Sequence, residues 1–152
     1  MPQQYYPPSS FYFKVLFDNF GEDQLNIDFQ SVSGLDAQFE TETFKEGGEN
    51  RFEHVMPVRT KFSDLILKRG IVRPESSQVT DWCISALINY QIEPKNLEVY
   101  LLNDKGNPMM YWKIIHAWPK NWKIGEMNAE KSEVFIETLE LNYNRYEFKK
   151  GV

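Results

Sequence analysis

The amino-acid sequence predicts a mainly β fold, an antiparallel barrel or sandwich of about eight strands with one packed α-helix at about residues 77–92. Apolar and polar residues alternate over much of the chain, a pattern typical of half-buried strands. Aromatic residues make up 15% of the 152 residues, and this enrichment favours strands over helices. Because this length fits one domain, we expect a single β-domain over residues 11–152, preceded by a flexible tail of residues 1–10.

The first half of the chain carries five expected strands, at residues 11–17, 26–33, 37–45, 52–58 and 62–69. In the third of these, Gln38, Glu40 and Glu42 form a polar face. Pro57 has no amide hydrogen to donate, so it must lie at a strand end or on a sheet edge.

The most loop-like stretch of the chain lies between the third and fourth strands. Its residues are Lys45, Glu46, Gly47, Gly48, Glu49, Asn50 and Arg51. Adjacent glycines indicate flexibility or a close backbone approach, and flanking glutamates disfavour an anion-binding nest. Charges of both signs are typical of a surface that meets a partner through complementary pairs, although a solvated hairpin tip has the same pattern.

One amphipathic helix is expected at about residues 77–92. Its apolar side chains form a single stripe, made of Val79, Trp82, Cys83, Ala86, Leu87 and Tyr90. Ser76 or Ser77 can cap the first turn, and Pro94 ends the helix. Ile84 and Ile88 lie outside the stripe on a flank that a monomer would normally keep polar. We therefore expect Trp82 to pack the helix and the two isoleucines to offer a second packing surface.

The second half of the chain carries three expected strands, at residues 97–101, 110–118 and 133–146. The first two form a hairpin around a glycine-containing turn at residues 103–107. In the last strand the apolar residues change phase between Ile136 and Leu139. That change predicts a bulge or a barrel corner, where the strand leaves one sheet for another.

Charge and composition exclude several classes of function. The chain has 17 Lys and Arg against 22 Asp and Glu, and the net charge of −5 disfavours nucleic acid and anionic membranes as partners. No run reaches the ~18 apolar residues of a membrane span, and the N-terminus lacks the pattern of a signal peptide. The single cysteine excludes an internal disulfide framework and a multi-cysteine zinc site. We therefore expect a protein that is made in the cytoplasm.

The sequence shows no catalytic motif, whether a phosphate-binding loop, a nucleophile elbow or a zinc-binding helix. His54 and His116 lie far apart without companion ligands, and His116 fits a hydrogen-bonded histidine in the core or an interface. Cys83 fits a buried, inert thiol. Glu137 and Glu140 lie close together, but nothing marks them as an acid and base pair. We expect no catalytic residue, no metal and no cofactor, and a non-enzymatic role in interaction.

Two other classes of function stay open on the residues alone. One is a monomeric β-barrel that binds a small molecule in a pocket lined by Tyr100, Trp112 and Trp118. The other is a hydrolase or transferase on a β-scaffold, for which the sequence offers no constellation of residues.

Short motifs follow one another in a fixed order from about Phe11 to Tyr146. They are S-G-L-D-A at 33–37, E-T-F-K-E-G-G-E-N-R at 42–51, L-I-L-K-R-G at 65–70, D-W at 81–82, L-L-N-D-K-G-N-P at 101–108, A-W-P at 117–119, M-N-A at 127–129 and V-F-I-E-T-L-E-L at 134–141. The ordered set resembles the tube proteins of contractile phage tails and related bacterial injection systems, which have an Hcp-like fold. Phe44 stands where many relatives carry tyrosine, and residues 1–10 have no counterpart.

The resemblance implies a structural subunit of an inner tube, in which hexameric rings stack into a hollow tube that sheath contraction drives through a target envelope. The implied partners are further copies of the chain, the contractile sheath protein, baseplate and tube-terminating proteins, and possible cargo in the lumen. Residues 45–51 would contact neighbouring protomers and the adjacent ring, and the helix would pack near a neighbour. The polar face of residues 38, 40 and 42 would face a water-filled lumen.

Assembly would take place in the bacterial cytoplasm, and the final particle would be extracellular, cell-anchored or a virion. The alternative role within the same machine is a baseplate adaptor that initiates the tube.

Overall fold

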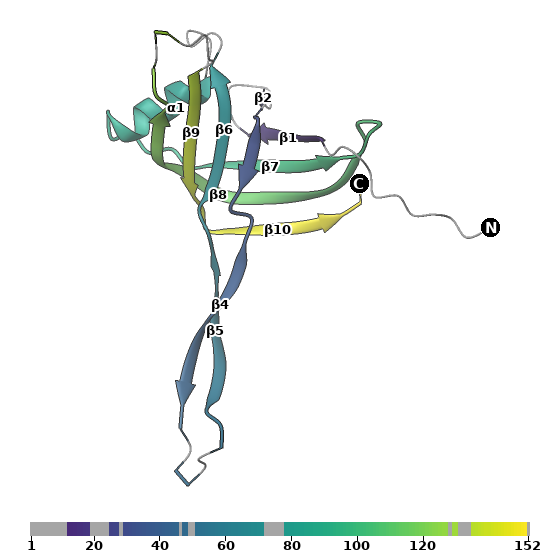
Figure 1. The fold of residues 1–152 in the computed structure, drawn as a ribbon, viewed down its shortest axis with the longest axis vertical. Helices are drawn as coiled ribbons and strands as arrows, with labels where there is room; N and C mark the ends of the chain where they lie inside the picture. The colour runs from purple at the N-terminus through teal and green to yellow at the C-terminus, as the bar shows by residue number, and fades with distance from the viewer. Residues whose placement is uncertain are drawn as a thin grey trace, which may run out of the picture.

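The computed structural model describes residues 12–18, 25–27, 29–45, 47–48, 51–71, 78–127, 129–130 and 135–151. These residues form one eight-stranded sheet, one two-stranded sheet and one helix, which confirms the expected mainly β class (Figure 1). The expected tail, residues 1–10, lies outside them. The elements are β1 (Tyr12–Phe17), β2 (Leu25–Ile27), β3 (Ser31–Ser33), β4 (Ala37–Phe44), β5 (His54–Phe62), β6 (Leu65–Ile71), α1 (Gln78–Leu87), β7 (Lys95–Leu102), β8 (Pro108–Ile124), β9 (Phe135–Asn142) and β10 (Arg145–Lys150).

Strand β8 connects the two halves of the larger sheet. Its first half pairs with β7 and β10, and its second half pairs with β9, in each case antiparallel. Beyond β7 come β1 and β2, and beyond β9 come β6 and β3. In Figure 1, β7, β8 and β10 run across the view while β6 and β9 run along it, so the two halves cross. The expected strand at residues 26–33 is in fact two short strands, because β2 pairs with β1 and β3 pairs with β6.

The core lies between the crossed halves and under the helix. Its fully buried members include Val15, Phe17, Leu65, Leu67, Val79, Cys83, Leu97, Ile114, Leu139 and Leu141. Trp82 joins them from the helix, with its ring edge-on to Phe17 at 5.9 Å between centroids. Alternate residues of β1, β6, β7 and β9 thus point inward, as the period-2 pattern predicts.

The direction of β8 changes at His116. This residue has a left-handed φ of +61°, and the register with β7 shifts there, because Leu97 pairs with Ile114 while Lys95 pairs with Ala117. The amide of His116 donates a hydrogen bond to Asn96 Oδ1 at 2.9 Å, and its side chain is exposed. Of the two environments expected for His116, the core is wrong, because the bulge turns this side chain outward and leaves Ala117 buried instead. A position in an interface stays a prediction.

Helix α1 is shorter than the sequence predicted. It ends at Leu87 and not near residue 92, because Tyr90 adopts a left-handed φ of +59° and the Gln91 amide bonds back to the Ser85 carbonyl at 2.8 Å. Pro94 therefore lies beyond the end of the helix. The buried stripe is confirmed for Val79, Trp82, Cys83 and Ala86, but it is wrong for Leu87 and Tyr90, which are exposed. The expected caps, at residues 76 and 77, lie outside the described residues.

The expected final strand consists of two strands, β9 and β10, which pair with different parts of β8. The expected bulge between Ile136 and Leu139 is wrong, since β6 and β9 pair without a break in register. The apparent change of phase has another cause, which is that Glu137 occupies the inward face together with Leu139 and Leu141. The chain passes from one half of the sheet to the other later, between β9 and β10.

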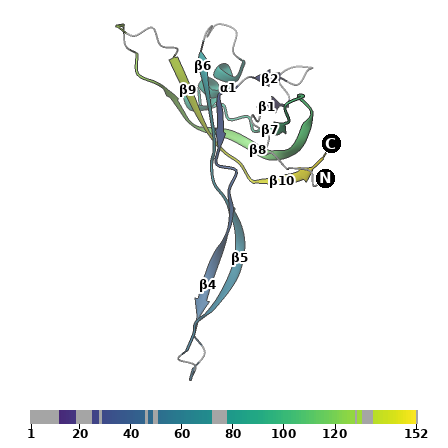
Figure 2. The same cartoon turned by 45° about the vertical axis from the view of Figure 1, so that its right-hand side comes forward.

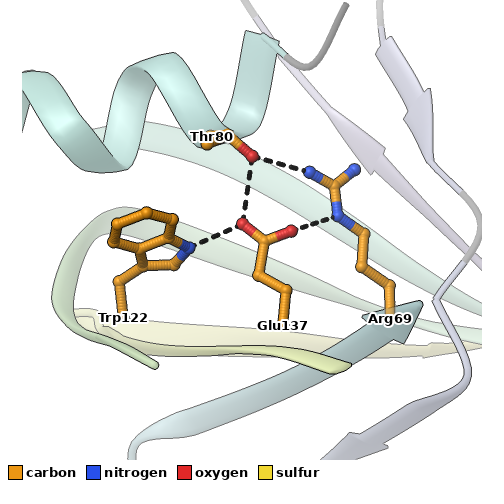
Figure 3. A network of polar contacts seen from close by, with 4 residues as sticks. All are labelled: Arg69, Thr80, Trp122 and Glu137. Atoms are coloured by element: carbon orange, nitrogen blue, oxygen red, sulfur yellow. Dashed lines mark hydrogen bonds and ion pairs between the residues drawn. The ribbon is translucent and has the colours of Figure 1, made fainter. Parts of the chain in front are cut away.

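Glu137 is fully buried and lies at the centre of a polar network (Figure 3). Its Oε2 accepts a hydrogen bond from Arg69 Nε at 2.6 Å, and its Oε1 accepts from Trp122 Nε1 at 2.7 Å and from Thr80 Oγ1 at 3.0 Å. Arg69 Nη2 also donates to Thr80 Oγ1 at 3.0 Å. A buried charge needs such partners, so the network fixes β6, β8, β9 and α1 against one another.

Strands β4 and β5 form a hairpin that projects from this body as a long arm (Figures 1 and 2). The expected boundaries at residues 52–58 and 62–69 are wrong, because β5 continues to Phe62 and the break falls at Ser63 and Asp64. Pro57 lies inside β5, and it is tolerated there because both strands of a two-stranded ribbon are edges. The register shifts next to it, since Glu40 pairs with Arg59 while residue 41 pairs with Pro57.

Candidate assembly interface

At the root of the hairpin, two chain segments cross at very short distance. Gly34 precedes β4 with a φ of +90°, and a Cβ added to it would lie 1.9 Å from the backbone oxygen of Asp64, which follows β5. Only glycine fits this position. The Asp64 carboxylate in turn accepts hydrogen bonds from Lys120 Nζ at 2.8 Å and Asn142 Nδ2 at 3.3 Å. The crossing is therefore tied to β8 and β9 of the body.

Two tyrosines from the corner between β9 and β10 hold the other side of the root. The Tyr143 hydroxyl donates to the Gly34 carbonyl at 3.4 Å, and the Tyr146 hydroxyl donates to the Leu35 carbonyl at 3.3 Å. Burial raises the pKa of Tyr143 far above its ordinary value, which keeps this hydroxyl protonated as a donor. The Phe62 ring packs against both tyrosine rings, at 6.0 and 4.8 Å between centroids. The hairpin thus leaves the body in a fixed direction.

Beyond the root, the two faces of the arm differ in charge. Residues that pair across an antiparallel ribbon share a face. One face, here called the charged face, carries all the charged residues of the two strands, and Glu40 and Arg59 form an ion pair of 2.9 Å on it. This face consists of Gln38, Glu40, Glu42, Phe44, His54, Met56, Arg59 and Lys61. The other face, here called the charge-free face, consists of Ala37, Phe39, Thr41, Thr43, Val55, Pro57, Thr60 and Phe62. The polar face expected for β4 is thus one whole side of the arm.

Aromatic rings gather near the tip of the arm. His54 stacks on Phe44 at 5.2 Å between centroids and meets Phe52 edge-on at 5.0 Å. Lys45 and Glu53 form an exposed ion pair of 3.5 Å. These contacts join the two strands where they approach the loop.

The described residues of the predicted contact loop lie at the far end of the arm from the body (Figure 1). Lys45, Gly47, Gly48 and Arg51 are exposed there, and Gly48 has a left-handed φ of +97°. The remaining predicted loop residues, Glu46, Glu49 and Asn50, lie outside the described residues. The structure brings this loop together with the apolar side chains of the arm, which the sequence interpretation did not include in the site.

The helix presents the second predicted surface. Trp82 is buried, and its indole nitrogen donates to the Glu93 carbonyl at 2.7 Å, so it packs the helix onto the body. Ile84 is partly buried, whereas Ile88 is 68% exposed. Exposed apolar neighbours continue from Ile88 past the helix end, and together they form the helix-end patch of Leu87, Ile88, Tyr90 and Ile92. This patch lies at the opposite end of the molecule from the hairpin tip (Figure 1).

A small apolar pocket of about 160 Å³ lies where β1, β3, β7 and β8 meet. Its lining includes Tyr100 and Trp112, as expected for a ligand-binding barrel, but not Trp118. The Tyr100 hydroxyl is hydrogen-bonded to Glu98, and burial raises the pKa of Tyr100 far above its ordinary value. Ligand pockets usually measure about 300–1,000 Å³, so this one is small for a drug-sized molecule.

Within the described part of the chain, no group of three or more His, Cys, Asp or Glu side chains is placed to hold a metal ion. Burial raises the pKa of the Cys83 thiol to about 12, with Glu137 adding to the effect, which confirms an inert buried cysteine. Glu137 and Glu140 point to different surroundings, because Glu140 pairs with Lys123 at 3.2 Å. The same described residues contain no helix long and apolar enough to cross a membrane.

An arm that is fixed at its root and exposes apolar side chains on one face suits a protein built into an assembly. The sequence matches the family model of the T4-like virus tail tube protein gp19 over residues 9–147. The chain belongs to this tail tube family. Its function is therefore that of a structural subunit of an inner tube, as the ordered motifs implied.

Solved structures similar to the tail tube chain come from contractile injection particles. A chain in the cryo-EM structure of the anti-feeding prophage baseplate is 30% identical, with a TM-score of 0.83, and the match covers 97% of this chain and 98% of that chain. A chain in the PVC sheath-tube complex, from an extracellular contractile injection system in the extended state, is 26% identical with a TM-score of 0.79, and the match covers 96% and 93% of the two chains.

Hcp1 from Flavobacterium johnsoniae shares the fold of the tail tube chain at 14% identity, with a TM-score of 0.59 and a match that covers 91% of this chain and 95% of that chain. This likeness confirms the expected Hcp-like fold. No curated protein sequence matches the chain significantly.

Proposed function

We propose that the β4–β5 hairpin is the element through which each tube subunit contacts its neighbours, and that residues 45–51 at its tip contact the adjacent ring. The observation that carries this proposal is the set of large apolar side chains that are exposed on the arm away from its charged face: Phe39, Phe52, Val55 and Val58. Exposed apolar clusters mark interaction surfaces, and a two-stranded ribbon alone is only marginally stable in water. The arm therefore gains its stability from other copies of the chain.

Six copies form a ring, and rings stack into a hollow tube. Head-to-tail contacts that close by rotation give rings, and a second, open-ended contact stacks them. The tube runs inside a contractile sheath and joins a baseplate at one end and a tube-terminating protein at the other. Contraction of the sheath supplies the free energy that drives the rigid tube through the target envelope. Subunits are made in the bacterial cytoplasm, and the finished particle acts outside the cell.

The charged face of the arm faces the water-filled lumen. Gln38, Glu40, Glu42 and the cations opposite them would lose hydration in a packed interface, whereas in a lumen they stay wet. The opposite, charge-free face can be buried without that cost. Cargo in the lumen would therefore meet a surface of mixed charge.

The helix-end patch is the second contact surface of the subunit. Ile88 is its most exposed isoleucine, and Ile84 lies one turn earlier on the same flank. Because the patch and the hairpin tip lie at opposite ends of the molecule, they can serve contacts with different neighbours (Figure 1).

Negative-stain electron microscopy of the purified chain, together with its mass by light scattering, tests the role of the hairpin. The wild-type chain should form six-fold rings and hollow tubes. Gly47→Pro stiffens the loop and Arg51→Glu reverses a charge in it, so both variants should stay folded and soluble but make no long tubes. Lys105→Glu, a charge reversal in the exposed β7–β8 turn, is the matched control and should leave the tubes intact. Normal tubes from both loop variants would remove the loop from this role.

A second candidate role is that of a baseplate adaptor that initiates the tube. The observation in its favour is that the similar chain at 30% identity comes from a baseplate structure. An adaptor needs a partner ring as its template, so it predicts a chain that stays monomeric at high concentration and assembles only when baseplate proteins are added.

A further inference from the structure

The apolar pocket of the body has the size of one aromatic ring. Its volume of about 160 Å³ is close to that of the roughly 150 Å³ apolar cavity known to bind benzene. It is lined by Phe13, Val32, Leu35, Val99, Tyr100, Leu101 and Trp112, none of which carries a charge. A ring placed in this pocket would leave water without separating any ion from its solvent.

The chain itself carries a suitable ring on the charge-free face of the arm. Phe39 is 64% exposed and pairs with Thr60 on the opposite strand. Its neighbours on the same face of its own strand are Ala37 and Thr41. Its own pocket is out of reach, because the extended chain carries Phe39 four residues beyond Leu35, or about 13 Å along the arm. A ring at position 39 would therefore have to enter a pocket of this kind on another copy of the chain.

The other exposed phenylalanines of the arm are less suited to this pocket. Phe44 is stacked on His54, and Phe52 meets the same imidazole ring edge-on. Burying either phenylalanine would draw this titratable ring out of water, which is costly. No such neighbour shares the face of Phe39.

We propose that the charge-free face of the hairpin of one subunit packs over the pocket of a second subunit, with the Phe39 ring inserted in it. The contact rests on the proposed role of the hairpin and names the surface that receives it. A single aromatic anchor in an apolar pocket is the usual form of an energetic hot spot. Leu35 belongs to both surfaces of the contact, since it lines the pocket and lies at the root of the arm. Each subunit thus offers both an anchor and a receptor, which a head-to-tail assembly requires.

The first test compares two truncations on opposite faces of the arm. Phe39→Ala should raise the concentration needed for assembly by at least about tenfold. Met56→Ala is the matched control, because Met56 is also exposed but lies on the charged face. Phe39→Leu keeps an apolar side chain of similar reach and should assemble at nearly the wild-type concentration. Assembly is followed by light scattering.

The second test is a disulfide between copies. Assemblies are made from a mixture of Phe39→Cys chains and Leu101→Cys chains, and mild oxidation should join residue 39 of one variant to residue 101 of the other. Cys83 needs no removal, since it is fully buried and its thiol is inert. Mass spectrometry of the linked peptides identifies the pair.

The inference is overturned if either test fails, either because Phe39→Ala assembles as readily as Met56→Ala or because assembled particles contain no 39–101 link. Failure of the proposed function looks different. A wild-type chain that never associates with itself or with baseplate proteins contradicts both proposals, and it is seen without any variant.

Discussion

An arginine–glutamate ion pair occurs in the body and another in the hairpin, and their surroundings are opposite. Arg69 and Glu137 meet at 2.6 Å with side chains that are 13% and 0% exposed, whereas Arg59 and Glu40 meet at 2.9 Å with side chains that are 73% and 44% exposed. The apolar residues differ in the same way, because the buried core lies in the body, whereas Phe39, Val55 and Val58 of the arm are exposed. The body is stabilised by its own chain, and the hairpin depends on other copies.

The largest expected difference comes from removing one partner of each ion pair. Glu137→Ala removes the carboxylate at the centre of the buried polar network and should lower the free energy of unfolding by about 3–5 kcal/mol. Glu40→Ala is the matched change in the hairpin and should cost at most about 1 kcal/mol. Chemical denaturation followed by tryptophan fluorescence measures both. Equal losses would mean that the arm is as much a part of the folding unit as the core.

The root of the hairpin should be the next most sensitive site. Gly34→Ala forces a Cβ to within 1.9 Å of the Asp64 backbone oxygen and should cost about 3 kcal/mol. Gly106→Ala is the control, because Gly106 also has a left-handed φ, of +80°, but has open space around it. Gly106→Ala should lower the free energy of unfolding by only about 1 kcal/mol, because it adds backbone strain without a clash. Thermal unfolding of the two variants separates the clash from the strain, and equal costs would contradict a tight crossing at the root.

The body should also show a pH dependence that the hairpin does not share. The Cys83 thiol has its pKa raised from 9.0 to about 12 by burial, so the unfolded chain loses this proton first as the pH rises. The contribution of Cys83 to the free energy of unfolding is fully present below pH 9 and should decline between pH 9 and 12. Cys83→Ala removes this part of the decline, which isolates it from the tyrosines. At pH 8 a thiol reagent should label Cys83 only on unfolding, and rapid labelling of the native chain would contradict its burial.

The smallest expected effect is that of an apolar truncation on the arm. Val55→Ala removes two methyl groups from a side chain that is 59% exposed, and it should change the stability of the unassembled chain by less than about 0.5 kcal/mol. Val99→Ala removes the same groups from the core and should cost about 2 kcal/mol. Denaturant titration compares the pair. A loss at Val55 as large as that at Val99 would place a hidden packing partner on the arm within the same chain.

Much of this architecture could be predicted from alternation, because alternate burial is what a half-covered strand requires. The failures fall on particular residues. His116 and Tyr90 take left-handed backbone angles, which are uncommon for any residue other than glycine. The inward position of Glu137 also could not be predicted, because a buried carboxylate is rare and only its partners in the folded chain explain it.

The candidate site was only partly predictable. The two glycines and the mixed charges of residues 45–51 indicate a contact loop, and the resemblance to tube proteins implies that this loop contacts neighbouring protomers and the adjacent ring. The projection of the arm could not be predicted, because an exposed ribbon alternates just as a half-buried strand does. The direction of the arm is set by tertiary structure, because the segments that contain Gly34 and Asp64 cross at its root and both strands leave the core from there.

Hydrogen exchange of the hairpin before and after assembly tests most directly whether neighbours stabilise the arm. Mass spectrometry would follow the amides of residues 39–44 and 54–60, with those of β7 and β9 as the internal reference for the body. The amides of the arm should exchange quickly in the unassembled subunit and slowly in the tube, while those of the body stay protected in both. An arm that is equally protected before and after assembly would contradict the account.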